Sequence, residues 1–282
     1  MFAPRAVFYC GALFTHDLAF TPQGLVAVNT LFSCLFRPDT GHSFVPLRQP
    51  PFITALTPDD RCHLNGLALV DGQPRYVTAL GPTDTAGGWR PDKLKAGVLM
   101  DITTNEILLH DLAMPHSPRV YDGEVYLLLS ATGEIVKADL EAGTYDVINK
   151  VPGFARGLSR YGDYLFVGLS HLRNTHTFGD LPLAQEGATT CGVTALHLPT
   201  GAIVGQMTYV NSCNEIYDVQ VLPGMGRPGI LGTAPPCSAA PSPCLSPPTG
   251  ARARSKQRKR EQPTPNRPMS IANSEQQVAG SR

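Results

Sequence analysis

The chain has 282 residues, of which 42% are hydrophobic, so it can bury a large core and is not a wholly disordered polymer. Its net charge is zero, but basic and acidic residues are unevenly distributed along the chain. Nine of the 23 basic residues but two of the 23 acidic residues lie from Gly226 onward, so an acidic body precedes a basic tail. No apolar run approaches the ~18 residues of a membrane span, and we expect none.

The seven cysteines form no Cys-x-x-Cys pair. This pattern favours a reducing compartment, and we expect a cytoplasmic protein.

The body repeats one unit five times. Each unit has polar residues at its start, a short apolar strand, a turn with glycine and a second apolar strand. The units begin at His16, His63, His116, Arg156 and Glu215. Short apolar runs separated by Asp-Gly or Gly-Asp are typical of β-hairpins, because these turns need positive φ.

Further strand pairs lie between these hairpins, so each unit has about four strands. A four-stranded unit that recurs every ~40–50 residues is typical of a propeller blade. The sequence therefore predicts an all-β protein, a β-propeller with four to five recognisable blades, in a ring that is either complete or truncated.

Two long connections interrupt the strand pattern, at residues 37–51 and at residues 81–96, which include the single tryptophan, Trp89. Long loops on a rigid scaffold often carry recognition groups. After Leu231 the composition changes to Pro and Ser and then to the basic run 252–260. We expect residues 1–231 to form the propeller and residues 232–282 to be a disordered tail, with nucleic acid an unlikely partner.

Several segments resemble an uncharacterised family of conserved-hypothetical proteins, a domain of unknown function with predicted β-propellers. The segments are residues 28–35, 60–68, 114–119, 152–158 and 215–219. One departure is Leu47-Arg48-Gln49-Pro50-Pro51, which lacks an aromatic residue that the resemblance leads us to expect. Asn65-Gly66-Leu67-Ala68 is also distantly similar to gluconolactonase-like and strictosidine-synthase-like propellers. The resemblance implies a fold and no reaction.

In a propeller the first strand of every blade lines the central channel, so the polar residues that start successive units should meet at one axial mouth. Two sites can be built from them. In one, His16, His63, His116 and Glu215 bind a divalent transition metal, since imidazole and carboxylate suit zinc, iron or manganese.

In the other, Asp17, Asn65 and Asp218 bind a hard cation such as calcium, as in the lactonase-like propellers, while Arg119 and Arg156 hold an anionic substrate. A third reading is that all these residues satisfy one another in a polar channel. The three histidines lie at different distances from their turn glycines, so they need not all face inward.

No Gly-x-Ser-x-Gly, phosphate-binding loop or His-Glu-x-x-His is present. We expect the protein to bind a small polar or peptide-like ligand at the axial mouth, with metal-dependent hydrolase or lyase activity as one form of that function. The alternative is a non-catalytic platform that binds a protein partner through the two long connections.

Overall fold

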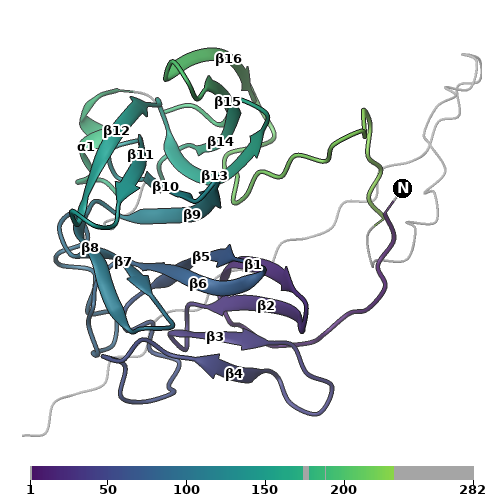
Figure 1. Ribbon diagram of the computed structural model, residues 1–282, viewed down its shortest axis with the longest axis vertical. Helices are drawn as coiled ribbons and strands as arrows, with labels where there is room; N and C mark the ends of the chain where they lie inside the picture. Colours follow the sequence, from purple (N-terminus) through teal and green to yellow (C-terminus); the bar gives the residue numbers. More distant parts are fainter. Residues whose placement is uncertain (1, 174–177, 188, 232–282) are drawn as a thin grey trace, which may run out of the picture. The chain divides into compact units, whose positions relative to one another are not determined.

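The computed structural model describes residues 2–173, 178–187 and 189–231. Four antiparallel sheets of four strands each follow one another along the chain (Figure 1). The first two sheets contain β1 (Thr15–Thr21), β2 (Gly24–Asn29), β3 (Cys34–Arg37), β4 (Val45–Arg48), β5 (Leu64–Val70), β6 (Gln73–Ala79), β7 (Gly97–Asp101) and β8 (Glu106–Leu112). The next two contain β9 (Pro115–Tyr121), β10 (Glu124–Leu129), β11 (Glu134–Asp139), β12 (Thr144–Lys150), β13 (Phe154–Tyr161), β14 (Tyr164–Ser170), β15 (Gly192–His197) and β16 (Ala202–Thr208).

In every sheet the strands pair in the order in which they occur in the sequence, so each sheet is a meander that forms one propeller blade. The first strands β1, β5, β9 and β13 lie innermost, and the last strands lie at the periphery (Figure 1). The predicted all-β propeller of four-stranded blades is confirmed, with four blades among the described residues.

The turns between the first two strands of the blades have the predicted chemistry. Asp71 and Gly72 have φ of 49° and 72°, and Asp122 and Gly123 have φ of 53° and 82°. Consecutive positive φ values give a turn whose twist matches that of the flanking strands. Local sequence therefore fixes where each blade folds back on itself.

The hydrophobic core lies between neighbouring blades. One cluster joins the first two blades through Val28, Leu35, Leu64 and Val77, and another joins the last two through Leu128, Ile135 and Leu165. These side chains are fully or almost fully buried. Each blade has an apolar face that only its neighbour covers, as in other repeat proteins.

The fifth repeat differs from its prediction, because residues 209–231 contain no strand apart from an isolated bridge between Phe2 and Ile230. The start of this repeat nevertheless packs on the fourth blade. Ser170 Oγ lies 3.1 Å from Ile216 O and accepts from Ile216 N at 2.9 Å, and Val221 N donates to Ser159 Oγ. The segment thus continues the ring without the partner strands that would make it a blade.

The two predicted connections also differ in structure. Residues 37–51 contain β4, which pairs with β3 as the outer strand of the first blade. Residues 81–96 form turns and no strand, and Trp89 within them is only 3% exposed. The short helix α1 (Pro182–Gln185) follows the fourth blade's second strand.

The predicted tail, residues 232–282, lies outside the described residues. Within the described part, no helix is long and apolar enough to cross a bilayer.

Candidate functional site

The innermost strands enclose a cavity of about 570 Å³ at one end of the propeller. Residues from all four blades and from the fifth repeat line it. They are Phe14, Thr15, His16, Asp60, His63, Trp89, Arg90, Met114, Arg156, Arg173, Phe178 and Tyr217. The cavity therefore has aromatic walls, two histidines and several arginines.

His16 and His116 occupy equivalent positions in the first and third blades. His16 Nδ1 lies 2.7 Å from Phe14 O and 2.8 Å from Thr30 Oγ1, and His116 Nδ1 lies 3.0 Å from Met114 O and 2.8 Å from Ser130 Oγ. Both hydroxyls donate their only proton to a carbonyl of the next blade, at 2.6 Å. Each Nδ1 must therefore be the donor, which leaves Nε2 as the acceptor of the neutral ring.

The ring of His63 lies beside that of His16, although the two histidines occupy different positions in their blades. One equivalent backbone bond within each of the first three blades allows their sequences to be aligned: Leu31 N to Leu13 O, Gly81 N to Cys62 O and Ala131 N to Ala113 O. His63 directly follows the residue that supplies the carbonyl, whereas His16 and His116 lie three residues after theirs. The His63 and His16 ring centroids are 4.8 Å apart, and those of His16 and His116 are 6.5 Å apart.

Asp60 holds His63 in place. Both oxygens of the Asp60 carboxylate lie 3.0 Å from His63 Nδ1, and Trp89 Nε1 donates to the same group at 3.1 Å. The Trp89 and His63 rings are 4.5 Å apart. A carboxylate can only accept, so the Nδ1 of His63 donates as well.

Irregular strand pairing accompanies the site in every blade. The register between the first two strands shifts between Thr15 and Leu18, between Leu64 and Gly66, between Tyr126 and Leu128, and between Arg156 and Leu158. An extra residue in one strand reverses which face the following side chains occupy. Because the shift recurs in all four blades, it does not account for the unequal spacing of the histidines. His63 precedes the shift in its blade and corresponds to Phe14 and Met114 in theirs.

The site favours uncharged histidines. Burial, together with the charges of His63 and Arg156, lowers the pKa of His16 from 6.5 to about 3. Burial also lowers the pKa of His116 well below 6.5, with contributions from Arg156 and His16. Both rings are therefore neutral at pH 7, and the Nε2 of His116 is buried without a hydrogen-bond partner among the described residues.

Arg156 is a buried cation in the cavity wall. It is 8% exposed, and its guanidinium lies 5.1 Å from the Phe154 ring centroid and 5.3 Å from that of Tyr217. Within the described residues its Nε has no hydrogen-bond partner, and no carboxylate forms an ion pair with it. Burial, and then repulsion from Arg173, lowers its pKa from 12.5 to about 10. The cavity therefore has a positive charge that no carboxylate among the described residues pairs with directly.

Glu215, predicted as a metal ligand, binds Arg173 instead. Arg173 Nε and Nη2 each lie 2.5 Å from one oxygen of Glu215, and Nη2 also donates to Tyr217 Oη. These bonds with Arg173 lower the pKa of Glu215 from 4.5 to about 2, so it is a carboxylate at pH 7. The charge of Arg173 is thus matched, unlike that of Arg156.

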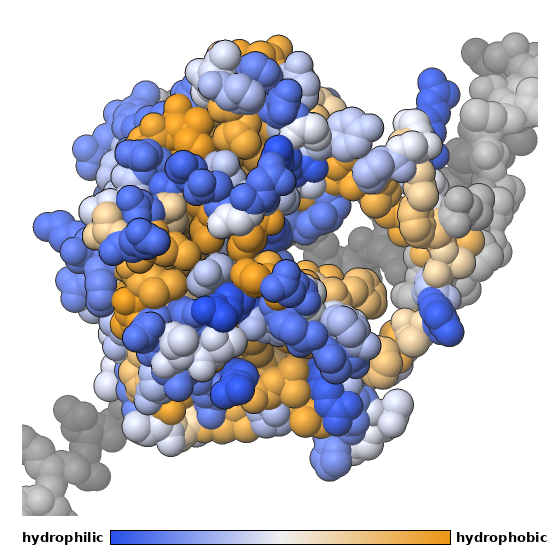
Figure 2. Space-filling model, viewed as in Figure 1, coloured by the Kyte–Doolittle hydropathy of each residue, from blue (hydrophilic) through white to orange (hydrophobic). Residues whose placement is uncertain are grey.

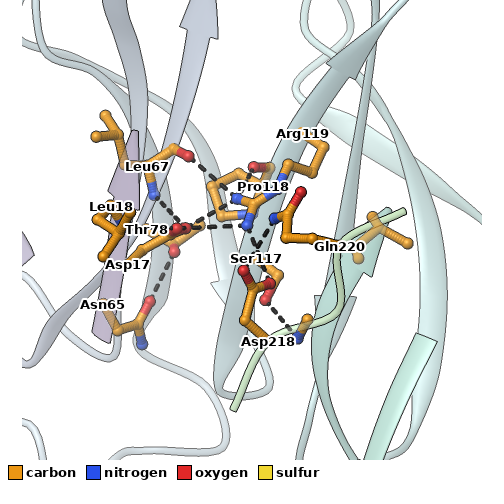
Figure 3. A network of polar contacts seen from close by, with 12 residues as sticks. Asp17, Leu18, Asn65, Leu67, Thr78, Ser117, Pro118, Arg119, Asp218 and Gln220 are labelled. Carbon is orange, nitrogen blue, oxygen red and sulfur yellow. Dashed lines mark hydrogen bonds and ion pairs between the residues drawn. The ribbon is translucent and has the colours of Figure 1, made fainter. Parts of the chain in front are cut away.

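Arg119, Asp17 and Asp218, predicted as ligand-binding residues, form a separate network away from the cavity lining (Figure 3). Arg119 Nη1 lies 2.8 Å from Asp17 Oδ2 and Nη2 lies 3.3 Å from Asp17 Oδ1, with Asp218 Oδ1 at 3.5 Å. Leu67 N donates to Asp17 at 3.0 Å. The network joins the first three blades to the fifth repeat.

Asn65 is 2% exposed, and its Oδ1 accepts from Thr78 Oγ1 at 2.7 Å (Figure 3). The oxygens proposed for calcium therefore already have partners within the protein. Among the described residues, no group of three or more His, Cys, Asp or Glu side chains is placed to hold a metal ion. The histidines do converge without Glu215, and metal binding stays a prediction.

The sequence did not point to Asp60, Arg173, Phe178 or Tyr217 as parts of the site. Asp60 lies three residues before His63, a spacing compatible with a local contact, and Arg173 follows the end of β14. Trp89 lies in one of the two long connections that were expected to carry recognition groups. Its ring is buried and packs beside the ring of His63. On the face shown in Figure 2, apolar residues form several patches separated by hydrophilic ones.

Four sequential four-stranded antiparallel meanders around an axial cavity define a β-propeller. The sequence model of a domain of unknown function, DUF4915, matches residues 1–231, and the chain belongs to this family. A comparison with curated proteins finds no match. The family assignment agrees with the resemblance found in the sequence and brings no named activity.

Solved structures similar to the chain include the Pan2 WD40 domain of Neurospora crassa, at 10% identity and a TM-score of 0.40, with 75% of this chain and 56% of that chain covered. The computationally designed Ika8 protein is similar at 13% identity and a TM-score of 0.37, with coverage of 74% and 52%. The designed Ika4 protein has 12% identity and a TM-score of 0.34, with coverage of 56% and 79%. The chain spans little more than half of the Pan2 and Ika8 chains.

Proposed function

We propose that the axial cavity binds a small organic anion and that Arg156 contacts its charged group. The observation that carries this proposal is the buried guanidinium of Arg156, which lines the cavity without an ion-pair partner among the described residues. Burying an unpaired charge costs several kcal/mol, so such a group is a candidate for function. A carboxylate or phosphate group would supply the missing charge and accept paired hydrogen bonds.

The surroundings of Arg156 support an anion rather than a cation. Arg173 lies close enough to lower the pKa of Arg156, and both arginines contribute to the lowered pKa of His16. The carboxylates nearest to the cavity are already engaged, Asp60 by His63 and Trp89, and Glu215 by Arg173. The unmatched charge of the cavity is therefore positive.

Arg119 provides the contrast that separates a structural arginine from a binding one. It is buried to a similar degree, but Asp17 and Asp218 neutralise it. Both arginines were predicted from the sequence to hold an anionic substrate, and the geometry supports Arg156 alone for this role.

The proposal can be tested by titrating purified protein with sodium acetate and with inorganic phosphate, as probes for carboxylates and phosphates. Ionic strength is held constant with sodium chloride, and unfolding temperature and calorimetric heat are measured. A ligand that binds only the folded state raises stability in a saturable way. We expect saturable binding of at least one probe by the wild type, and none by Arg156→Met.

Arg160→Met is the matched control, because Arg160 lies near the surface and pairs with Asp122 outside the cavity. It should bind the probes as the wild type does. The proposal is overturned if the wild type binds neither probe, or if Arg156→Met binds them as strongly as the wild type.

A further inference from the structure

His16 gives the cavity a hydrogen-bond acceptor whose tautomer is fixed by the fold. His16 lines the cavity, and its Nδ1 proton is shared between Phe14 O and Thr30 Oγ1. Its Nε2, on the other edge of the ring, has no hydrogen-bond partner among the described residues. Because the ring is neutral at pH 7, with a pKa lowered to about 3 by burial and nearby charges, Nε2 can accept a hydrogen bond but not donate one.

The acceptor and the cation belong to the same cavity. Arg156 and His16 both line it, and their electrostatic coupling contributes to the lowered pKa of His16. The ligand that satisfies both must therefore present an anionic group to one and a hydrogen-bond donor to the other. A buried polar group left without a partner costs free energy, so each group selects for its complement.

The donor is more consistent with a hydroxyl than with an ammonium group. Arg156 and Arg173 line the cavity together with His16, and of these two arginines only Arg173 has a carboxylate partner among the described residues, so the cavity opposes a further positive charge. An ammonium group placed against Nε2 would meet the same opposition. A hydroxyl group donates without adding charge.

Aromatic side chains supply the rest of the lining, among them Trp89, Phe178 and Tyr217. These rings cannot replace the water around a ligand that carries many charged groups, but they can pack against the carbon skeleton of a small molecule. The cavity of about 570 Å³ falls within the usual size range of small-molecule sites.

We infer that the ligand is a hydroxylated organic anion, with its carboxylate or phosphate on Arg156 and a hydroxyl group donating to His16 Nε2. This inference rests on the proposed anion-binding function and adds the second contact, which sets specificity. His16 acts in it as a ligand-binding residue.

The test compares pairs of probes that differ only in their hydroxyl groups. Glycolate, with one hydroxyl group, is compared with acetate, and glycerol 3-phosphate, with two, is compared with propyl phosphate, by calorimetric titration at pH 7 and constant ionic strength. A neutral hydrogen bond contributes modestly, so we expect the hydroxylated member of at least one pair to bind roughly three- to tenfold more tightly. The pair that shows the preference identifies the anionic group.

Three variants locate the effect. His16→Phe should remove the preference while the hydroxyl-free probe still binds, and His110→Phe, at an exposed histidine on β8, should keep it. Arg156→Met should abolish binding of both members of a pair. A second measurement uses the wild type alone, so it does not depend on the folding of a variant. It is the ¹⁵N chemical shift of His16 Nε2. If the carboxylate pair shows the preference, this shift should change with glycolate and not with acetate, and if the phosphate pair shows it, with glycerol 3-phosphate and not with propyl phosphate.

The outcomes separate the two proposals. Equal affinity for both members of each pair in the wild type overturns the inference about the hydroxyl group and leaves anion binding intact. A preference that persists in His16→Phe also overturns it, because the hydroxyl would then donate elsewhere. Binding of no probe at all overturns the proposed function itself.

Discussion

Replacing Arg156 and Arg119 by methionine should have opposite effects on stability, although both arginines are buried. The pKa of Arg156 falls from 12.5 to about 10, and at 1.36 kcal/mol per pH unit this corresponds to a folded-state cost of about 3 kcal/mol for its charge. Methionine keeps much of the packing against Phe154 and Tyr217 but loses a cation–π attraction of about 1 kcal/mol. We expect Arg156→Met to raise the free energy of unfolding by about 1–2 kcal/mol.

Arg119→Met removes one partner of a buried ion pair and leaves Asp17 without its cation. Such a change typically costs about 3–5 kcal/mol. The free energies of unfolding of the two variants should therefore differ by at least about 4 kcal/mol at pH 7, with Arg156→Met above the wild type and Arg119→Met below it. This difference corresponds to on the order of 8–16 °C in unfolding temperature for a domain of this size.

The assay is urea-induced unfolding of wild type, Arg156→Met and Arg119→Met in phosphate-free buffer at low ionic strength. Removing multivalent anions matters, since an anion bound to Arg156 would conceal the cost of its charge. If Arg156→Met loses as much stability as Arg119→Met, Arg156 has a structural partner and the assignment of an unmatched charge is wrong.

Three further outcomes follow from the structure. Glu215→Gln should be less stable than the wild type above pH ~4.5, because the folded-state pKa of Glu215 is lowered to about 2. The difference in stability should disappear as the pH falls toward 2. Unfolding measured over a series of acidic pH values tests this, and a difference that persists near pH 2 would contradict it. Gly157→Ala should cost about 1–3 kcal/mol more than Gly162→Ala in chemical unfolding, since both have positive φ but only the Cβ at 157 meets backbone, 2.4 Å from Val219 N; equal losses would mean that the fifth repeat does not pack there. Leu128→Ala should lower the free energy of unfolding by about 2–5 kcal/mol, and a loss below 1 kcal/mol would contradict its full burial in the core.

The fold could be predicted because its signals are local. Asp71-Gly72 and Asp122-Gly123 mark hairpins within a few residues of sequence, and the alternation beside them fixes the strands. The fifth repeat could not be judged in this way. Its first segment has the same local pattern, but a strand also needs a partner, and residues 209–231 do not pair in a sheet.

The sequence predicted several residues of the site but only part of their arrangement. The sequence predicted His16, His63, His116 and Arg156 as site residues. It did not show that His63 precedes the first paired residue of its strand, whereas His16 and His116 follow theirs. The sequence could not show that Arg119 forms an ion pair with Asp17, which lies 102 residues away, because the two side chains meet only when the first and third blades pack together.

The hydroxyl groups of Thr30 and Ser130 connect the chemistry of one blade to the presence of the next. Each donates its proton across the blade boundary, to Leu64 O or Ala155 O, and therefore accepts from the histidine of its own blade. Removing the next blade would free the hydroxyl to rotate away, but the carbonyl of Phe14 or Met114 would still accept from Nδ1. An isolated blade grafted onto another scaffold would thus keep the tautomer of its histidine and lose one of the two contacts that orient the ring.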